Sequence, residues 1–362
     1  MHPYSRGLSF PKRAVFIGAL LVLVLTAVAL IAGRTLDWAP IDFCRFYAGS
    51  KMILAGQTPY GQIPFFAPPW LAFLLSPLLL LPRSSAALVW VLLNIATIIA
   101  SFQTFWTLAS APGQRHRAAL LGLAAIAPYA LFSYITGQLS IVALSACVLS
   151  AWGLTTGRHW PAAMGLILAS LKPHIVALPM ALVILELMHR RQWQPLLITS
   201  SALLAMGLVA TLLVPAWPRA MLASWGSGAF YEPRDNLLGL STFDVPLWFT
   251  YPFVAYALLL WWSRGLDAHV LALAVAVNLL AIPYSRSYDY VLLLLPLAAA
   301  RGASPSPQRR VSLGLVLLAQ LLPLLRVFVP QAGLVEVLAP ALCTLGMLLI
   351  SQLGWSAPQC KS

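Results

Sequence analysis

The sequence predicts an all-α polytopic membrane protein, and three observations support this fold class. Of its 362 residues, 60% are hydrophobic and only 9% are charged, whereas a soluble globular chain carries about 25% charged residues. The mean hydropathy is +0.86. The apolar segments are continuous, and many approach the roughly 20 residues that a helix needs to cross a bilayer. We therefore expect a bundle of about ten to twelve transmembrane helices that forms one membrane domain over residues 1–362.

The formal net charge of +13 does not indicate a nucleic-acid partner. Lys and Arg occur singly or in small groups between apolar segments. This distribution is typical of membrane proteins, in which an excess of Lys and Arg in the cytoplasmic loops sets the orientation. Most acidic residues fall in loops that this topology assigns to the other side. We expect a multi-pass protein of the plasma (inner) membrane with a cytoplasmic N-terminus, a functional face turned outward, and no nucleic acid among its partners.

The first apolar segment, residues 14–32, is predicted to be a helix that is retained, because it is longer than the 7–15-residue apolar core of a signal peptide. A large outer loop over residues 34–82 follows it. This loop holds Asp37 and Asp42 together with several basic and aromatic side chains. Its proline-rich end, residues 64–82, is expected to be a partly embedded juxtamembrane helix.

The later apolar segments are expected to be spanning helices, separated by short loops except for a second long outer loop over residues 215–246. The expected spans are residues 86–108, 118–135, 141–155, 196–214, 247–262, 270–282, 290–300, 311–329 and 334–350.

The segment over residues 162–187 carries Lys172-Pro173-His174 in its middle and lies between two basic loops. It must therefore return to the side that it left, yet it is too long for one span and too short for two. A pair of short helices broken at Lys172-Pro173 meets both conditions, since proline interrupts the helical hydrogen bonds and restricts the residue before it. Broken backbone at membrane depth is tolerated where it lines a cavity, so we expect Lys172 in a polar cavity.

Four polar groups share the outer side in this topology. They are Asp42, Gly137-Gln138, Lys172-Pro173-His174, and the stretch from Arg286 to Asp289. A carboxylate that faces cations suits a reaction in which a base takes a proton from a hydroxyl while a phosphate leaves. A lipid-linked phosphate, reached from the bilayer, is the natural donor for such a site. No Cys/His cluster has metal-ligand spacing, so no metal site and no cofactor are expected.

Simpler interpretations accompany these residues. Asp42 alone fits a solvated loop acid or a helix cap, and Arg286 with Asp289 fits a structural ion pair. His174 fits a satisfied polar neighbour of Lys172. The aromatic residues of the first loop are as well explained by anchoring at the membrane interface.

The polar motifs, taken in order, resemble glycosyltransferase family 87, whose members are membrane enzymes. The resemblance covers nearly the whole chain, and its most specific parts are the first loop and the run that ends in Lys172-Pro173. The motifs are Asp42-Phe43, Phe46-Tyr47-Ala48, Leu54-Ala55-Gly56, Pro59-Tyr60, Pro68-Pro69, Pro77-Leu78, Leu81-Pro82, Gly137-Gln138, and Gly165 followed by Leu171-Lys172-Pro173.

The resemblance implies a GT-C-like fold and an inverting transfer of a sugar, typically mannose, from a polyprenyl-phosphate donor to an acceptor hydroxyl. It implies Asp42 as the catalytic base and Lys172 and Arg286 beside the donor phosphate. The expected partners are that lipid-linked donor, an unidentified lipid, glycan or protein acceptor, and the bilayer. The remaining predicted substrate-binding residues are Arg45, Tyr47, Tyr60, Gln138, His174 and Asp289.

The alternative is a transporter or flippase of lipid-linked sugars that performs no catalysis. Transporters typically carry internal repeats and place polar residues along both halves of a pathway. This sequence has no evident repeat, and its polar residues gather on one predicted side, so the enzyme is favoured.

Overall fold

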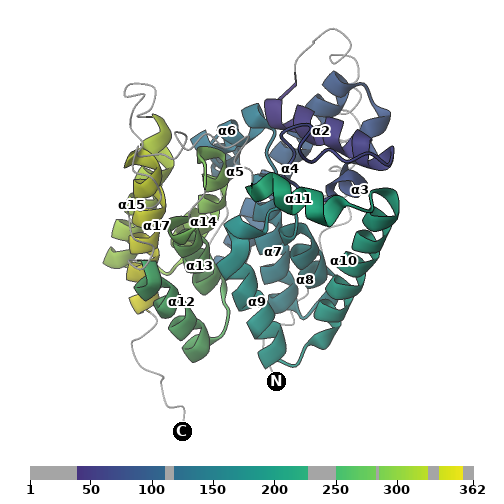
Figure 1. Ribbon diagram of the computed structural model, residues 1–362. Coiled ribbons are helices and arrows are strands. Elements are labelled where there is room, and N and C mark those ends of the chain that lie inside the picture. Colours follow the sequence, from purple (N-terminus) through teal and green to yellow (C-terminus); the bar gives the residue numbers. More distant parts are fainter. Residues whose placement is uncertain (1–38, 111–117, 227–249, 283–284, 325–333, 354–362) are drawn as a thin grey trace. The chain divides into compact units, whose positions relative to one another are not determined.

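The computed structural model describes residues 39–110, 118–226, 250–282, 285–324 and 334–353 (Figure 1). In these ranges every regular element is a helix, and the only bridge between extended segments joins Tyr60 to Ile63. The predicted helix over residues 14–32, Asp37 and most of the second long loop lie outside the described residues.

The described residues form two compact units. The first unit draws on Met1–Thr97, Tyr134–Gln138 and Ala202–Phe230, and the second unit on Ile98–Ser133, Leu139–Ser201 and Tyr231–Ser362. Two long helices, α4 (Arg83–Ala109) and α10 (Trp193–Leu213), contribute to both units.

In the first unit, α2 (Ile41–Leu54) forms within the polar first loop. Asp42 lies in its first turn and Lys51 in its last turn, which matches the helix dipole at both ends. The inner face of α2 is buried, and Gly49 lies on that face, where an added Cβ would come within 2.2 Å of the Phe65 ring. The loop after α2 therefore packs directly on the helix backbone.

The remainder of the first loop is fixed by buried tyrosines rather than by a long helix. The Tyr60 hydroxyl donates to the Ala67 carbonyl at 2.9 Å, and the Tyr47 hydroxyl donates to the Leu81 carbonyl at 2.7 Å. The expectation of one juxtamembrane helix over residues 64–82 is wrong in detail. Proline limits the helices here to two short ones, α3 (Leu71–Leu75) and the 3-10 turn η1 (Leu78–Leu80).

The second unit is a bundle whose central helix is α13 (Ala268–Ala281), buried from Val270 to Leu279. The helices that pack on α13 include α9, α12, α14 and α17. Apart from its parts of α4 and α10, the elements of this unit are α5 (Ala118–Ala125), most of α6 (Pro128–Thr136), α7 (Ser140–Thr156), α8 (His159–Ala169), η2 (Pro173–Val176), α9 (Ala177–His189), α12 (Tyr251–Arg264), α13, η5 (Ser287–Leu293), α14 (Leu294–Gly302), α15 (Pro307–Leu321), η6 (Leu322–Leu324) and α17 (Leu334–Leu353).

The predicted break at Lys172-Pro173 is confirmed, because α8 ends at Ala169 and a 3-10 turn starts at Pro173 before α9. The first half of the broken segment packs tightly on α7. A Cβ added at Gly165 would meet the Ser150 hydroxyl at 2.2 Å. Small residues at such contacts let two helices approach closely in the absence of a strong hydrophobic drive.

Three expected elements are corrected. Residues 118–135 do not form one helix, because Pro128 starts a second helix, α6, after α5. The span expected over residues 290–300 begins instead as the 3-10 segment η5, and only α14 is α-helical. The second long loop contains a helix, α11 (Trp217–Gly226).

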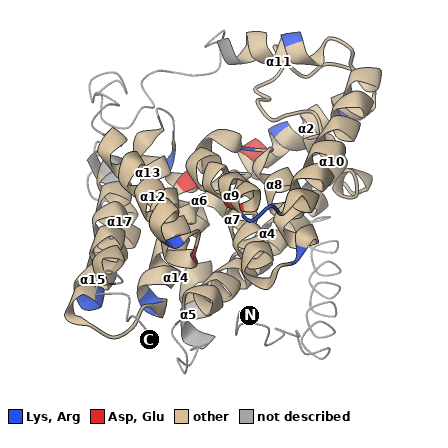
Figure 2. Cartoon of the chain, turned by 90° about the horizontal axis from the view of Figure 1, so that it is seen from below, with Lys and Arg blue, Asp and Glu red and all other residues tan. Residues whose placement is uncertain are grey.

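Two helices in the described ranges, α4 and α10, have both the length and the composition to cross a membrane. Five further apolar helices are shorter. Figure 2 shows that charged residues occupy few positions along the described helices. This apolar, all-helical architecture is consistent with a helical membrane protein; the count of ten to twelve spans stays a prediction.

Candidate active site

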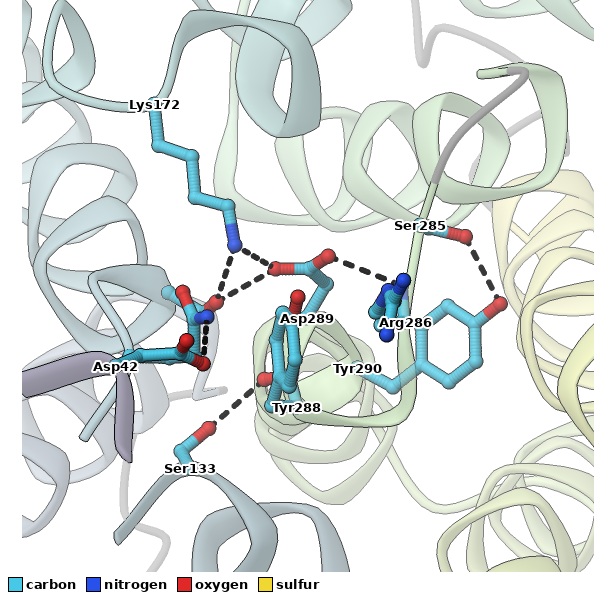
Figure 3. A network of polar contacts seen from close by, with 10 residues as sticks. Asp42, Ser133, Lys172, Ser285, Arg286, Tyr288, Asp289 and Tyr290 are labelled. Atoms are coloured by element: carbon cyan, nitrogen blue, oxygen red, sulfur yellow. Dashed lines mark hydrogen bonds and ion pairs between the residues drawn. The ribbon is translucent and has the colours of Figure 1, made fainter. Parts of the chain in front are cut away.

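Asp42 is the centre of a polar cluster in the first unit. Its side chain is 17% exposed, and Oδ1 accepts a hydrogen bond from Arg45 Nη1 at 2.8 Å, one turn along α2. Oδ2 accepts a hydrogen bond from Gln138 Nε2 at 2.6 Å (Figure 3). Because both carboxylate oxygens accept from donors, the ionised form of Asp42 fits these surroundings.

Asp42 does not act as the cap of α2. Pro40 occupies the N-cap position, and no side chain caps this end of the helix. The carboxylate therefore gains from the helix dipole while its hydrogen bonds go to Arg45 and Gln138.

The Gly137-Gln138 turn holds the Gln138 amide beside Asp42. Gly137 has φ +74°, and a Cβ there would lie 2.7 Å from Phe43 Cβ and 2.8 Å from Pro40 Cβ. Its carbonyl accepts a hydrogen bond from Trp90 Nε1 at 3.1 Å, and the Trp90 ring stacks on Phe43. Only glycine satisfies both the backbone conformation and the close approach to the start of α2.

Lys172 is the centre of a second polar cluster, in the second unit. The residue lies at the break before Pro173 with φ −147° and ψ 65°. Its ammonium forms an ion pair with Asp289, contacts Ser140 Oγ at 3.0 Å, and lies 4.6 Å from the centre of the Tyr288 ring. The Lys172 side chain is 11% exposed. Figure 3 shows it directed at the Asp289 carboxylate.

Asp289 is fully buried, with 0% exposure. Its Oδ1 accepts from Ser140 Oγ at 2.6 Å as well as from Lys172, and its Oδ2 accepts from the Arg286 backbone N–H at 3.0 Å. A buried carboxylate is tolerated when a cation and hydrogen-bond donors occupy its oxygens, and Asp289 meets that condition. One side chain thus holds both Lys172 and the backbone of the Arg286 turn.

Residues that the sequence did not single out hold this cluster in place. Asn278, buried in α13, donates from Nδ2 to the His174 carbonyl at 3.2 Å and accepts from the Leu178 backbone N–H at 2.9 Å. Ser133 Oγ donates to the Tyr288 carbonyl at 2.8 Å. An asparagine inside an apolar helix is a signal that could have marked the first of these, since such residues are costly unless hydrogen-bonded.

The other predicted site residues differ in their surroundings. Tyr47 and Tyr60 are buried, and their hydroxyl groups bond loop carbonyls. Burial raises the pKa of the Tyr60 phenol, which keeps it a neutral donor. His174 is exposed, one residue after Pro173. No group of three His, Cys, Asp or Glu residues suited to a metal occurs in the ranges that the structure describes.

The sequence model of glycosyltransferase family 87 matches residues 65–351. The chain belongs to glycosyltransferase family 87. The matched range of this family 87 chain includes Gln138, Lys172 and Arg286, and it begins after Asp42. Comparison with curated proteins and with solved structures gave no match. Membership implies a glycosyltransferase that uses a sugar donor and an acceptor.

Proposed function

We propose that this family 87 chain transfers a sugar, by family resemblance mannose, from a polyprenyl-phosphate donor to an acceptor hydroxyl at the outer membrane face. Asp42 acts as the general base and the transfer inverts the anomeric centre. The observation that carries the proposal is the Asp42 carboxylate, which is partly exposed and held by Gln138 and Arg45.

The other acids with described side chains are committed elsewhere. Glu186 is buried and bonded to Arg190 and Trp261, and Asp267 accepts two backbone N–H groups at the start of α13. Asp289 is buried and bonded by Lys172 and Ser140. Among these four carboxylates, Asp42 alone combines partial exposure with freedom from a buried ion pair or a helix cap.

In the proposed step the acceptor hydroxyl donates to Asp42 and loses its proton to the carboxylate. The acceptor oxygen forms a bond to the anomeric carbon as the bond from that carbon to the phosphate oxygen breaks. The bonding electrons leave with polyprenyl phosphate. Gln138 fixes the orientation of the base, because its amide bonds one carboxylate oxygen at 2.6 Å.

Lys172 and Arg286 stabilise the departing phosphate in this proposal. The charge of Lys172 is balanced by Asp289, so Lys172 offers N–H donors while Arg286 supplies additional positive charge. Asp289 is a positioning residue for both, through the ion pair and through the Arg286 backbone.

The test is release of polyprenyl phosphate from synthetic polyprenyl-phosphate-mannose by the purified full chain in detergent, with a broad acceptor mixture. Wild type is compared with Asp42→Asn, and Asp267→Asn is the matched control because asparagine also caps a helix well. We expect turnover by wild type and the control, and a loss of about 10²-fold to 10⁴-fold for Asp42→Asn. Donor binding without turnover in any variant would instead favour the transport alternative.

A further inference from the structure

One end of the second unit combines basic and aromatic side chains, and we call it the basic rim. It lies where α7 meets α8, where α9 meets α10, and at the end of α12. The rim consists of Arg158, Trp160, Arg191, Trp193, Trp262 and Arg264, all exposed. The three tryptophans are 67%, 52% and 77% exposed in chain order.

Hydrogen bonds join the helix ends that carry the rim. Arg190 Nη1 donates to the Leu154 carbonyl at 3.3 Å, which links the ends of α9 and α7. Trp261 Nε1 donates to Glu186 Oε2 at 2.7 Å, which links the ends of α12 and α9. Thr199 Oγ1, near the start of α10, donates to the Ala163 carbonyl, near the start of α8, at 3.3 Å. The two helices therefore begin at this same end. The rim is therefore one surface.

The turn at Arg191 is unusual among the three. The turns that follow α7 and α12 use Gly157 and Gly265, with φ +68° and +75°. The turn after α9 instead places Arg191 at φ +55°, the only non-glycine residue with positive φ in the described ranges. The Gln192 N–H bonds the Leu187 carbonyl at 2.8 Å, as in a glycine-terminated helix. Any side chain is disfavoured in this conformation, so an arginine at this position indicates a role for its side chain.

The charge balance of the rim is positive. Glu186 is buried and engaged by Arg190 and Trp261, and Asp267 caps α13. Among the described residues no hydrogen bond or ion pair involves the Arg191 guanidinium. Guanidinium groups suit phosphate oxygens, and exposed tryptophans at helix ends are typical of the membrane interface.

We propose that the basic rim binds the phosphate groups of anionic phospholipids in the leaflet that it faces. The site is separate from the Lys172 cluster, since α9 runs its whole length of about 20 Å between Pro173 and Arg190. The proposal rests on the chain being a membrane protein and is independent of its catalytic step. It also assigns the rim to the leaflet that carries anionic lipid, which is the cytoplasmic one.

Arg191→Gly is expected to raise the unfolding temperature without lipid and to reduce the further rise that anionic lipid causes. The purified full chain is heated in neutral detergent, alone or with phosphatidylglycerol or phosphatidylcholine, and its unfolding temperature is followed. Without lipid, the variant unfolds at a higher temperature than wild type, because glycine relaxes the turn. Phosphatidylglycerol raises the unfolding temperature of wild type more than that of the variant. The apparent affinity of the variant for this lipid falls about fivefold, because one cation near the surface is lost.

Lys51→Gln, which removes an exposed cation from α2 in the first unit, is the charge-matched control and keeps the full phosphatidylglycerol gain. Trp160→Ala is a second variant that leaves the turn intact and also reduces the gain. An equal gain in wild type and Arg191→Gly overturns the proposal. So does an equal gain from soluble glycerol phosphate, which identifies a free-anion site rather than a lipid site.

Discussion

Asp42 and Asp289 both form ion pairs, yet they differ in how far the carboxylate is exposed, and exposure decides whether it can reach a substrate. Asp42 is partly exposed, and its cation, Arg45, is an exposed side chain one turn away on α2. Asp289 is completely buried, and its oxygens serve Lys172, Ser140 and the Arg286 backbone. A base must reach a substrate proton, whereas a buried, saturated carboxylate orders its neighbours. The comparison supports the proposal that Asp42 is the base and that Asp289 positions its neighbours.

The largest expected effect on stability comes from Asp289→Ala. The substitution leaves the Lys172 ammonium buried without its carboxylate, which costs about 3–5 kcal/mol of unfolding free energy. Thermal unfolding in detergent measures it. The double variant Asp289→Leu with Lys172→Met removes both charges and recovers most of the loss in stability, while sugar transfer is lost together with the Lys172 ammonium. Wild-type stability of Asp289→Ala would contradict the positioning role.

Gly137→Ala tests the turn that holds Gln138 beside Asp42. Positive φ and the contacts with Phe43 and Pro40 both oppose a Cβ, and we expect a loss of about 1–3 kcal/mol. Gly61→Ala is the matched control, with φ +78° and no neighbour within 4 Å of the added Cβ. The difference between the two unfolding free energies measures the close approach alone. Equal losses would mean that the contact with α2 is unimportant.

The sequence predicts those features that depend on neighbouring residues. Proline marks the break at Lys172-Pro173, and hydropathy marks α4 and α10. It places the residues of α2 in a polar outer loop, although the buried side chains Phe43, Phe46, Tyr47 and Ile53 do follow a helical spacing. The sequence predicts Gln138 and Asp289 as site residues but not their pairing with Asp42 and Lys172, from which they lie 96 and 117 residues away. Such pairs arise from tertiary packing, which local pattern does not contain.

The effect expected for Gln138→Ala is of similar size but falls on catalysis rather than on stability. Loss of the amide leaves Asp42 less well oriented, and a hydrogen bond to a charged group contributes about 1.5–3 kcal/mol. We expect kcat to fall roughly tenfold to a hundredfold with KM for the donor nearly unchanged. A rise in KM alone would indicate that Gln138 binds substrate instead. Gln138→Asn, which keeps the amide on a shorter side chain, should recover part of kcat.

The smallest effect is expected for Arg45→Gln. The Arg45 side chain is 43% exposed, and exposed pairs one turn apart on a helix contribute about 0.5 kcal/mol or less. Unfolding free energy should therefore change little, in contrast to the buried pair at Asp289. A loss above about 2 kcal/mol would show that the exposed Arg45–Asp42 pair contributes as much to stability as a buried pair, against the difference drawn here between the two aspartates.

The most direct test of the central claim compares the two aspartates in a single turnover. Purified Asp42→Asn and Asp289→Asn, matched for folded fraction, are loaded with polyprenyl-phosphate-mannose and supplied with acceptor, and the rate of polyprenyl phosphate release is measured. We expect Asp42→Asn to bind donor but to release polyprenyl phosphate at least about a hundredfold more slowly than wild type, while Asp289→Asn retains measurable chemistry. Release by Asp42→Asn at the wild-type rate would show that Asp42 is not the base.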